Sequence, residues 1–173
     1  LKKKYKNIIT IIIPRHVNRA NEIKDELNSN NLKVHLHTSN KPINNDTDIY
    51  IVDTFGETKK FHKMGSSVFL GGSIIKRGGQ NPLEAARYGA RILHGPNIDN
   101  FKDVYKLLKT LKASKKITTP KELANLITFK KNRKIGNKIK KIGAIILKNT
   151  IKELDSLIND DLKKTWVLEF KKT

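Results

Sequence analysis

The sequence contains no cysteine, few aromatic residues (6%) and one methionine, which is not at its start. The chain therefore has no disulfides and no thiolate metal ligands, which is typical of a reducing compartment. Its best apolar runs, residues 8–13 and 142–147, are far shorter than the roughly 18 residues of a membrane span. No signal-peptide pattern is present. Because the chain opens almost directly on a strand-like run, we expect it to be a piece of a longer protein.

Arginine is also scarce, although the chain is strongly basic. The 173 residues carry a formal net charge of +20, with 36 basic and 16 acidic residues, and only six of the basic residues are arginine. Such a charge predicts an anionic partner: nucleic acid, a lipid-headgroup surface or phosphorylated substrates. We attribute the lysine excess mostly to compositional bias and solubility. The arginines are the better guide, because a guanidinium binds two phosphate oxygens at once.

Strand-like and helical patterns alternate through the first 112 residues. We predict strands at residues 7–13, 32–37, 48–52, 67–70 and 91–93, and helices at residues 18–28, 57–64, 82–88 and 101–112. This alternation predicts an α/β fold, a Rossmann-like parallel sheet with helices on both faces. Helices are predicted again at residues 120–130, 138–158 and 162–170. We place a Rossmann-like domain at residues 1–130 and basic C-terminal helices at residues 131–173.

Three unusual loops follow predicted strands: Pro14-Arg15-His16, then Asp53-Thr54-Phe55-Gly56-Glu57, then residues 71–81. Since ligands of such sheets bind at the carboxyl ends of the strands, we expect all three loops at one edge. Arg15 is either a phosphate clamp or an ordinary surface arginine.

Five of the ten glycines lie within residues 69–89. The Gly71-Gly72-Ser73 turn offers backbone N–H groups and a hydroxyl to an oxyanion, although a Gly-Gly turn alone is more often only a turn. The pattern is not the GxGxxG of a dinucleotide site. Gly78-Gly79 stands before the next helix and distinguishes its setting from other helix starts in the chain.

That helix begins with Asn81-Pro82-Leu83-Glu84, which has the pattern of a capping box and is explained without a ligand. Thr119-Pro120-Lys121-Glu122 has the same pattern and no glycines before it. In the glycine-rich setting, however, a phosphate would be stabilised beside the helix start, and a carboxylate would be placed to bind the hydroxyls of a ribose.

Two apparent metal motifs are better explained otherwise. Asp46 and Asp48 precede a predicted strand, at the wrong end for a ligand site, so we assign them to a turn. His35 and His37 alternate on one strand face, but no third ligand is evident. We expect no metal site.

Taken in series, the motifs resemble a known family. IIIPRH at residues 11–16, DTDIYIVDTFGE at residues 46–57 and VFLGGSIIKRGGQNPLEAARYGARILHGPNIDNF at residues 68–101 resemble the C-terminal half of the Kdo (3-deoxy-D-manno-octulosonic acid) transferases of lipopolysaccharide synthesis. The resemblance covers about residues 7–112. It implies the nucleotide-sugar-binding domain of a GT-B type glycosyltransferase, with CMP-Kdo as donor and a lipid A precursor as acceptor. It further implies no cofactor or metal, and a place at the cytoplasmic face of the bacterial inner membrane, on its anionic surface.

The resemblance also assigns roles to residues. It implies that the donor's phosphate and sugar are bound by one set of side chains and backbone groups: Arg15, His16, Gly71, Gly72, Ser73, Gly79, Gln80 and Asn81. Glu84 would bind the ribose hydroxyls. The loop formed by Asp53, Thr54, Phe55, Gly56 and Glu57 would lie beside the cytosine.

The departures from the family pattern concern catalysis. Many relatives have histidine at the position of Gln80, and nothing here resembles the family's catalytic glutamate, which belongs to an N-terminal domain. We therefore expect this fragment to have no catalytic residue of its own and to be inactive alone. The first strand of the donor domain is expected to be missing too, and the basic C-terminal helices would pack on this domain or toward the N-terminal one.

Two rival functions remain open. A GT-B enzyme with a UDP-sugar donor would bind UMP as well as CMP. A basic nucleic-acid-binding domain would need a wide basic stripe with stacking aromatic residues, and its binding would weaken steeply with salt. The low aromatic content argues against the second rival, so we expect no nucleic-acid partner.

Overall fold

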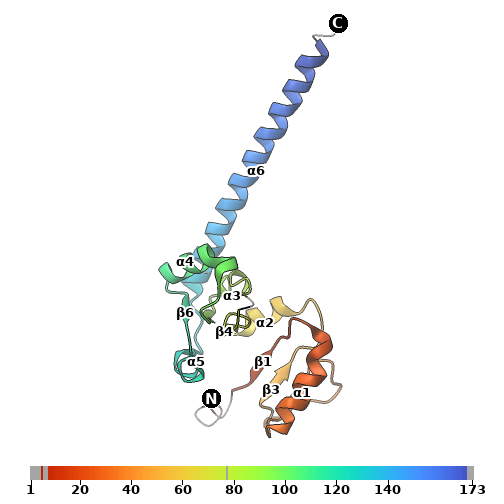
Figure 1. The fold of residues 1–173 in the computed structure, drawn as a ribbon, viewed down its shortest axis with the longest axis vertical. Coiled ribbons are helices and arrows are strands. Elements are labelled where there is room, and N and C mark those ends of the chain that lie inside the picture. The colour runs from red at the N-terminus through yellow and green to blue at the C-terminus, as the bar shows by residue number, and fades with distance from the viewer. Residues whose placement is uncertain (1–4, 6–7, 77, 171–173) are drawn as a thin grey trace.

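The computed structural model describes residues 5, 8–76 and 78–170, with residues 160–170 described by their backbone alone. In chain order the elements are β1 (Thr10–Ile12), η1 (Val17–Arg19), α1 (Ala20–Ser29), β2 (Val34–Leu36), β3 (Ile49–Ile51), α2 (Thr58–Met64), β4 (Ser67–Leu70), α3 (Leu83–Ala86), β5 (Arg91–His94), η2 (Asp99–Phe101), α4 (Lys102–Thr110), β6 (Ser114–Lys116), α5 (Pro120–Leu126) and α6 (Arg133–Phe170). Figure 1 shows the elements before α6 gathered at one end, with α6 extending away from them.

All strand pairs in this part of the chain are parallel, which confirms the predicted α/β class. The strands form two three-stranded sheets, in the orders β1-β3-β2 and β4-β5-β6. In the first sheet Ile11 is paired with Tyr50, and in the second Val68 is paired with Ile92. Within the described residues β1 and β4 each pair with one strand only, so each leaves one backbone edge without a strand neighbour.

Each sheet has its own apolar core. The first core joins α1 to the β1-β3-β2 sheet, with Ala20 and Ile51 almost fully buried. The second is larger and joins the β4-β5-β6 sheet to α3, α4 and the first turns of α6. Ile92 and Leu108 at its centre have no exposed surface. Burial of such side chains contributes about 1.5–3 kcal/mol each, which fixes the strand ends that carry the loops.

Strand β6 and the continuity of α6 were not predicted. Ser114–Lys116 lacks the β-branched residues of a strand, and it is extended because Leu93 and His94 of β5 pair with Lys115 and Lys116. Helix α6 is one helix from Arg133, where two helices were predicted.

The start of α6 belongs to the second core. Ile139 is 4% exposed and packs there together with the partly buried Ile135. Gly136 lies against the turn before β5, because a Cβ on Gly136 would stand 2.8 Å from the backbone nitrogen of Gly89. None of the described helices is long and apolar enough to cross a membrane.

Candidate functional site

The loop after β4 is held from inside by Ser73, whose side chain is completely buried. Its hydroxyl donates a hydrogen bond to the Leu70 carbonyl (2.7 Å) and accepts one from the Gly95 backbone N–H (2.8 Å). A hydroxyl has one proton, so Ser73 has none left for a ligand in this arrangement. Ser73 therefore shapes the loop, and the expectation that its hydroxyl donates to an oxyanion is not supported here.

The two glycine pairs of this loop lie against each other. Gly72 has φ +80°, and a Cβ there would stand 2.8 Å from the Gly78 carbonyl oxygen. Both restrictions exclude a side chain at Gly72. Gly71 is different, because no heavy atom lies within 4 Å of where its Cβ would be. The backbone is thus tightly packed behind Gly72 and open in front of Gly71.

The second glycine pair is held by an asparagine that the sequence interpretation missed. Gly79 donates its backbone N–H to Asn100 Oδ1 (3.0 Å), and Asn100 Nδ2 donates to the Gly79 carbonyl (2.7 Å). Asn97 binds the first part of the loop in a similar way, with Nδ2 donating to the carbonyls of Ser73 and Ile74 (3.1 Å each). The signal was present in HGPNIDN after β5, where two amide side chains follow a strand end.

The capping box predicted at α3 is only partly formed. Asn81 Oδ1 accepts a hydrogen bond from the Leu83 backbone N–H (3.0 Å). The N-cap residue of α3 is nevertheless Pro82, which forms no side-chain cap hydrogen bond, so the prediction of Asn81 at the N-cap was one residue too early. Among the described residues no hydrogen bond joins the Glu84 carboxylate back to the helix start. At α5, by contrast, Glu122 accepts hydrogen bonds from both the backbone N–H and the hydroxyl of Thr118, at 2.7 and 3.0 Å. Capping thus explains Glu122 but not Glu84.

Glu84 points instead toward a buried histidine of α2. His62 Nδ1 lies 3.8 Å from Glu84 Oε2, with side-chain exposures of 10% and 59%. Burial lowers the pKa of His62, and the Glu84 carboxylate opposes that shift. His62 Nδ1 has no hydrogen-bond partner among the described residues. This contact joins α2, which follows the loop after β3, to α3, which follows the glycine-rich loop.

The loop after β3 is anchored by Asp53. Its carboxylate accepts hydrogen bonds from the backbone N–H (3.0 Å) and the hydroxyl of Thr38. Burial alone would raise the pKa of Asp53, but the hydrogen bonds from Thr38 outweigh it and the pKa is lowered. Thr54 Oγ1 is buried and has no hydrogen-bond partner among the described residues. Such a hydroxyl is a candidate to bind a ligand group.

The remaining residues of that loop differ in exposure. Phe55 is 77% exposed, and Gly56 has φ +83°. Glu57 forms an ion pair with Lys60 at 2.8 Å. An exposed aromatic ring offers a flat surface on which a base can stack. The base-side assignment of this loop stays a prediction.

Arg15 and His16 are exposed in the turn after β1, and within the described residues neither side chain makes a hydrogen bond or ion pair. Gln80 is exposed as well, and its backbone carbonyl accepts from the Tyr105 hydroxyl (3.5 Å). The structure therefore brings the two glycine pairs together, whereas the Glu84 carboxylate lies beside His62. It shows no contact between them and Arg15 in the part of the chain that it describes.

The residues suspected of metal binding have other contacts. Lys33 forms an ion pair with Asp46, and its backbone N–H donates to Asp48 Oδ2 (2.8 Å). His35 stacks on Tyr50, and His37 Nδ1 lies 2.7 Å from the Tyr50 hydroxyl oxygen. In the described ranges no group of three or more His, Cys, Asp or Glu is arranged to hold a metal ion.

Several known proteins similar to this chain share one name. A protein of Rickettsia bellii called 3-deoxy-D-manno-octulosonic acid transferase is 37% identical over 130 residues, which are 75% of this chain and 31% of that protein. A protein of the same name from Haemophilus influenzae is 30% identical over 105 residues, 61% of this chain and 25% of its own length. The chain thus spans about a third or less of these relatives. No protein-family model matches it.

A solved structure is similar in fold. The C-terminal CMP-Kdo binding domain of WaaA from Acinetobacter baumannii superposes with a TM-score of 0.67 at 23% sequence identity. The match covers 72% of this chain and 65% of that one. It agrees with the predicted GT-B type donor domain in its fold.

Proposed function

The chain is related to the 3-deoxy-D-manno-octulosonic acid transferases over part of their length, and we propose that it is the donor-binding part of such a glycosyltransferase. The donor would be CMP-Kdo and the acceptor a lipid A precursor. The observation that carries the proposal is the glycine-rich loop, whose backbone is fixed behind Gly72 and open at Gly71. A rigid, open backbone at the end of a parallel strand is suited to a phosphate.

The phosphate and sugar of the donor would lie against Gly71, Gly72 and Asn81, with Ser73 and Gly79 holding the loop in shape. The Gly79 N–H is already bonded to Asn100, so Gly79 contributes the absence of a side chain rather than a donor group. Arg15 and His16 are exposed and unpaired within the described residues, which leaves both free to meet the phosphate. Arg15 would supply the two-pronged contact that guanidinium groups make to phosphate.

Glu84 would hold the ribose hydroxyls. Its carboxylate is not used to cap α3, and it lies toward His62 rather than toward the helix start. A carboxylate accepts hydrogen bonds from two neighbouring hydroxyls at once. The unpartnered hydroxyl of Thr54 and the exposed ring of Phe55 would lie on the side of the cytosine.

In the transfer an acceptor hydroxyl would attack the anomeric carbon of the donor and CMP would depart. The base that takes the hydroxyl proton would come from a part of the enzyme outside this chain, and Gln80 would not replace it. We expect no metal in the step, with Arg15 and the loop backbone stabilising the departing phosphate. Preorganised groups of this kind contribute about 2.7–4 kcal/mol each in other enzymes. The reaction would take place at the cytoplasmic face of the inner membrane.

Calorimetric titration of the chain with CMP, with UMP as a second titrant, tests this proposal. We expect CMP to bind more tightly than UMP, and Glu84→Ala to weaken CMP binding by about 1–3 kcal/mol because a hydrogen-bonding partner is lost. Glu122→Ala is the matched control, because Glu122 is the equivalent glutamate of a helix start that has no glycine loop. It should lower stability by about 1 kcal/mol and leave CMP affinity unchanged. Equal binding of UMP would favour a UDP-sugar enzyme, and equal effects of the two variants would refute the role of Glu84.

A further inference from the structure

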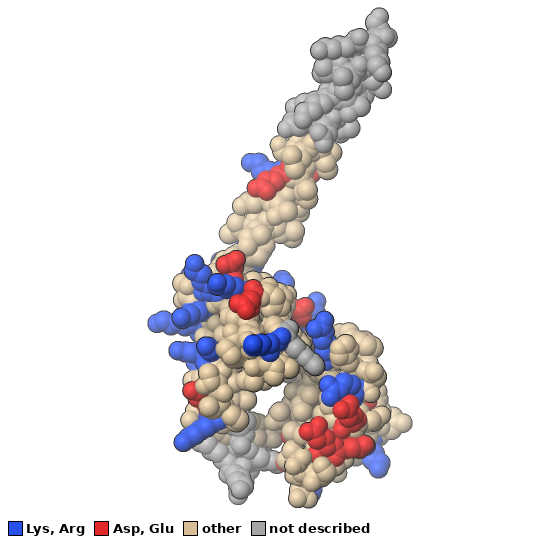
Figure 2. Space-filling view, in the orientation of Figure 1, with Lys and Arg blue, Asp and Glu red and all other residues tan. Residues whose placement is uncertain are grey.

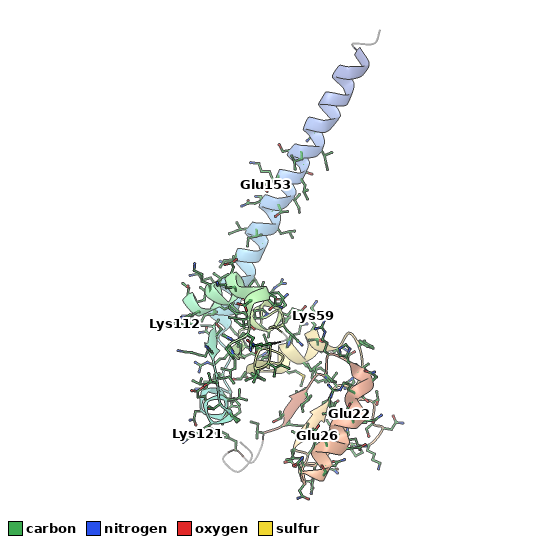
Figure 3. The ribbon with its side chains drawn as sticks, in the orientation of Figure 1. Glu22, Glu26, Lys59, Lys112, Lys121 and Glu153 are labelled. Carbon is green, nitrogen blue, oxygen red and sulfur yellow. The ribbon has the colours of Figure 1, made fainter. Side chains whose placement is uncertain are left out.

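Helices α2 and α3 pack against each other. Figure 1 shows them side by side, and Lys59, labelled in Figure 3, marks α2. Helix α3 follows the glycine-rich loop, and its residues Ala85 and Ala86 are buried in the second core. Glu84, the candidate ribose-binding residue, therefore projects from a fixed backbone, although its own side chain is 59% exposed.

His62 is the only buried residue of α2, and it faces Glu84. Its Nδ1 atom lies 3.8 Å from Glu84 Oε2 and has no hydrogen-bond partner among the described residues. A buried ring nitrogen without a partner is unfavourable, so it points to a contact that is completed in another state of the protein. A hydrogen bond from nitrogen to oxygen spans about 2.7–3.2 Å, and a small movement of the exposed Glu84 side chain would complete it.

The protonation of His62 suits it to donate to Glu84 without neutralising the carboxylate. Burial lowers the pKa of His62, so the ring is neutral at pH 7 and carries one proton. A carboxylate can only accept hydrogen bonds, which favours the tautomer with that proton on Nδ1. The bond would use one of about four lone pairs on the two carboxylate oxygens, and the others remain for ribose hydroxyls.

The Glu84 carboxylate has little else to orient it. Among the described residues no hydrogen bond reaches it, and His62 is its only ion-pairing neighbour. A long, exposed side chain loses rotamer freedom when it binds a ligand, and that loss weakens binding. A donor on a neighbouring packed helix reduces the loss, because it holds the carboxylate in one position beforehand.

We propose that His62 is a positioning residue of the candidate donor site. Its Nδ1–H donates a hydrogen bond to Glu84 Oε2 when a nucleotide binds, and this directs the carboxylate to the two neighbouring hydroxyls of the ribose. The ligand class is a ribonucleoside monophosphate, because a 2′-deoxyribose offers only one of these hydroxyls. The inference rests on the proposed function and adds to it the residue that makes Glu84 selective for ribose.

A comparison of CMP with 2′-deoxy-CMP isolates this contact. Figure 2 shows Lys and Arg side chains spread over the part of the chain before α6, and these attract the phosphate of either nucleotide. Since the two nucleotides share the phosphate and the base, the ratio of their affinities reports on the ribose contact alone. We expect the unchanged chain to bind CMP about tenfold more tightly than 2′-deoxy-CMP, as for one hydrogen bond to a charged group.

Calorimetric titration of His62 variants with both nucleotides tests the proposal. His62→Phe keeps a flat ring but has no donor, and it should reduce the affinity ratio to about twofold or less. His62→Asn places an amide N–H near the position of Nδ1 and should keep most of the ratio. His94→Phe is the matched control, because His94 of β5 is similarly buried (6% exposed, against 8% for His62), and it should leave the ratio unchanged. Circular dichroism shows whether each variant is folded, and His62→Leu repeats the deletion with a smaller side chain.

A double variant tests whether His62 acts through Glu84. Glu84→Ala alone should remove the ratio, and His62→Phe added to Glu84→Ala should change it no further. A ratio that persists in His62→Phe but is lost in Glu84→Ala would overturn the inference and leave the donor proposal standing. Equal loss in His62→Phe and His94→Phe, or no recovery in His62→Asn, would overturn it as well. An unchanged chain that binds neither nucleotide would instead refute the donor proposal, and the role of His62 with it.

Discussion

Asn100 and Gly79 are joined by two hydrogen bonds, with Gly79 N–H donating to Asn100 Oδ1 at 3.0 Å and Asn100 Nδ2 donating to the Gly79 carbonyl at 2.7 Å. One side chain thus fixes a peptide unit that lies 21 residues earlier in the chain. The neighbouring Gly78 has φ +77°, and a Cβ there would meet the Asn100 side chain at 3.1 Å. The left-handed glycine and the amide therefore define the position of the second glycine pair together.

Asn100→Ala removes both of these hydrogen bonds. We expect it to reduce the free energy of unfolding by about 1–3 kcal/mol, since each net hydrogen bond contributes about 0.5–1.5 kcal/mol. It should also weaken CMP binding, because the loop loses its fixed position. Urea unfolding and calorimetry measure the two effects. Asn18→Ala, on an exposed residue of η1, is the control and should change neither. Undiminished CMP affinity in folded Asn100→Ala would separate the second glycine pair from the donor site.

Alanine substitutions at the neighbouring residues Gly71 and Gly72 should affect stability differently. Gly72→Ala places a Cβ at φ +80° and 2.8 Å from a backbone oxygen, so it should reduce stability by about 1–3 kcal/mol. Gly71→Ala meets no atom within 4 Å and should leave stability unchanged. It should nevertheless weaken CMP binding if the open backbone at Gly71 contacts the donor. Thermal unfolding and calorimetry on both variants check this, and CMP affinity that survives Gly71→Ala would remove Gly71 from the site.

Local sequence patterns predicted the helices and strands that are determined by their own residues. Ile49–Ile51 and Ser67–Leu70 were found as strands because β-branched and aromatic residues follow one another between turn residues. The start of α3 was predicted to within one residue because Asn81 acts on the next residues of its own chain. Strand β6 could not be found in this way, because Lys115 is extended only through its pairing with β5.

The candidate site shows the same difference between local and long-range determinants. The glycine positions and Asn81 could be predicted from a short window, but the partners that fix them could not. Ser73 is bonded to Gly95, 22 residues away, and His62 lies beside Glu84 through the packing of α2 against α3. No pattern near Glu84 reveals that its carboxylate makes no hydrogen bond at the helix start. The equivalent carboxylate of Glu122 does make one, to Thr118. Such choices depend on the tertiary neighbours of a side chain.

The buried histidines predict how stability depends on pH. Burial lowers the pKa of His62 and of His94 below the ordinary value of 6.5. Between those lowered values and 6.5 the unfolded chain binds more protons than the folded chain, so acidification favours unfolding. The free energy of unfolding should therefore fall between pH 7.5 and pH 5. His62→Gln should make this fall shallower, and His16→Gln, on an exposed residue, should not. Urea midpoints across that range would contradict the explanation if all three proteins showed the same slope.

Alanine substitutions at two glycines of α6 test whether the start of this helix packs against the turn before β5. A Cβ on Gly136 would stand 2.8 Å from Gly89 N and 3.0 Å from the Arg87 carbonyl oxygen, and backbone atoms cannot move aside easily. Gly136→Ala should therefore reduce stability by about 1–3 kcal/mol, as overpacking does. Gly143→Ala meets no atom within 4 Å, so the better helix propensity of alanine should raise stability by about 0.5–1 kcal/mol. Urea unfolding gives both values. Stabilisation by both variants would mean that α6 does not rest on the turn before β5, because only that contact distinguishes the two positions.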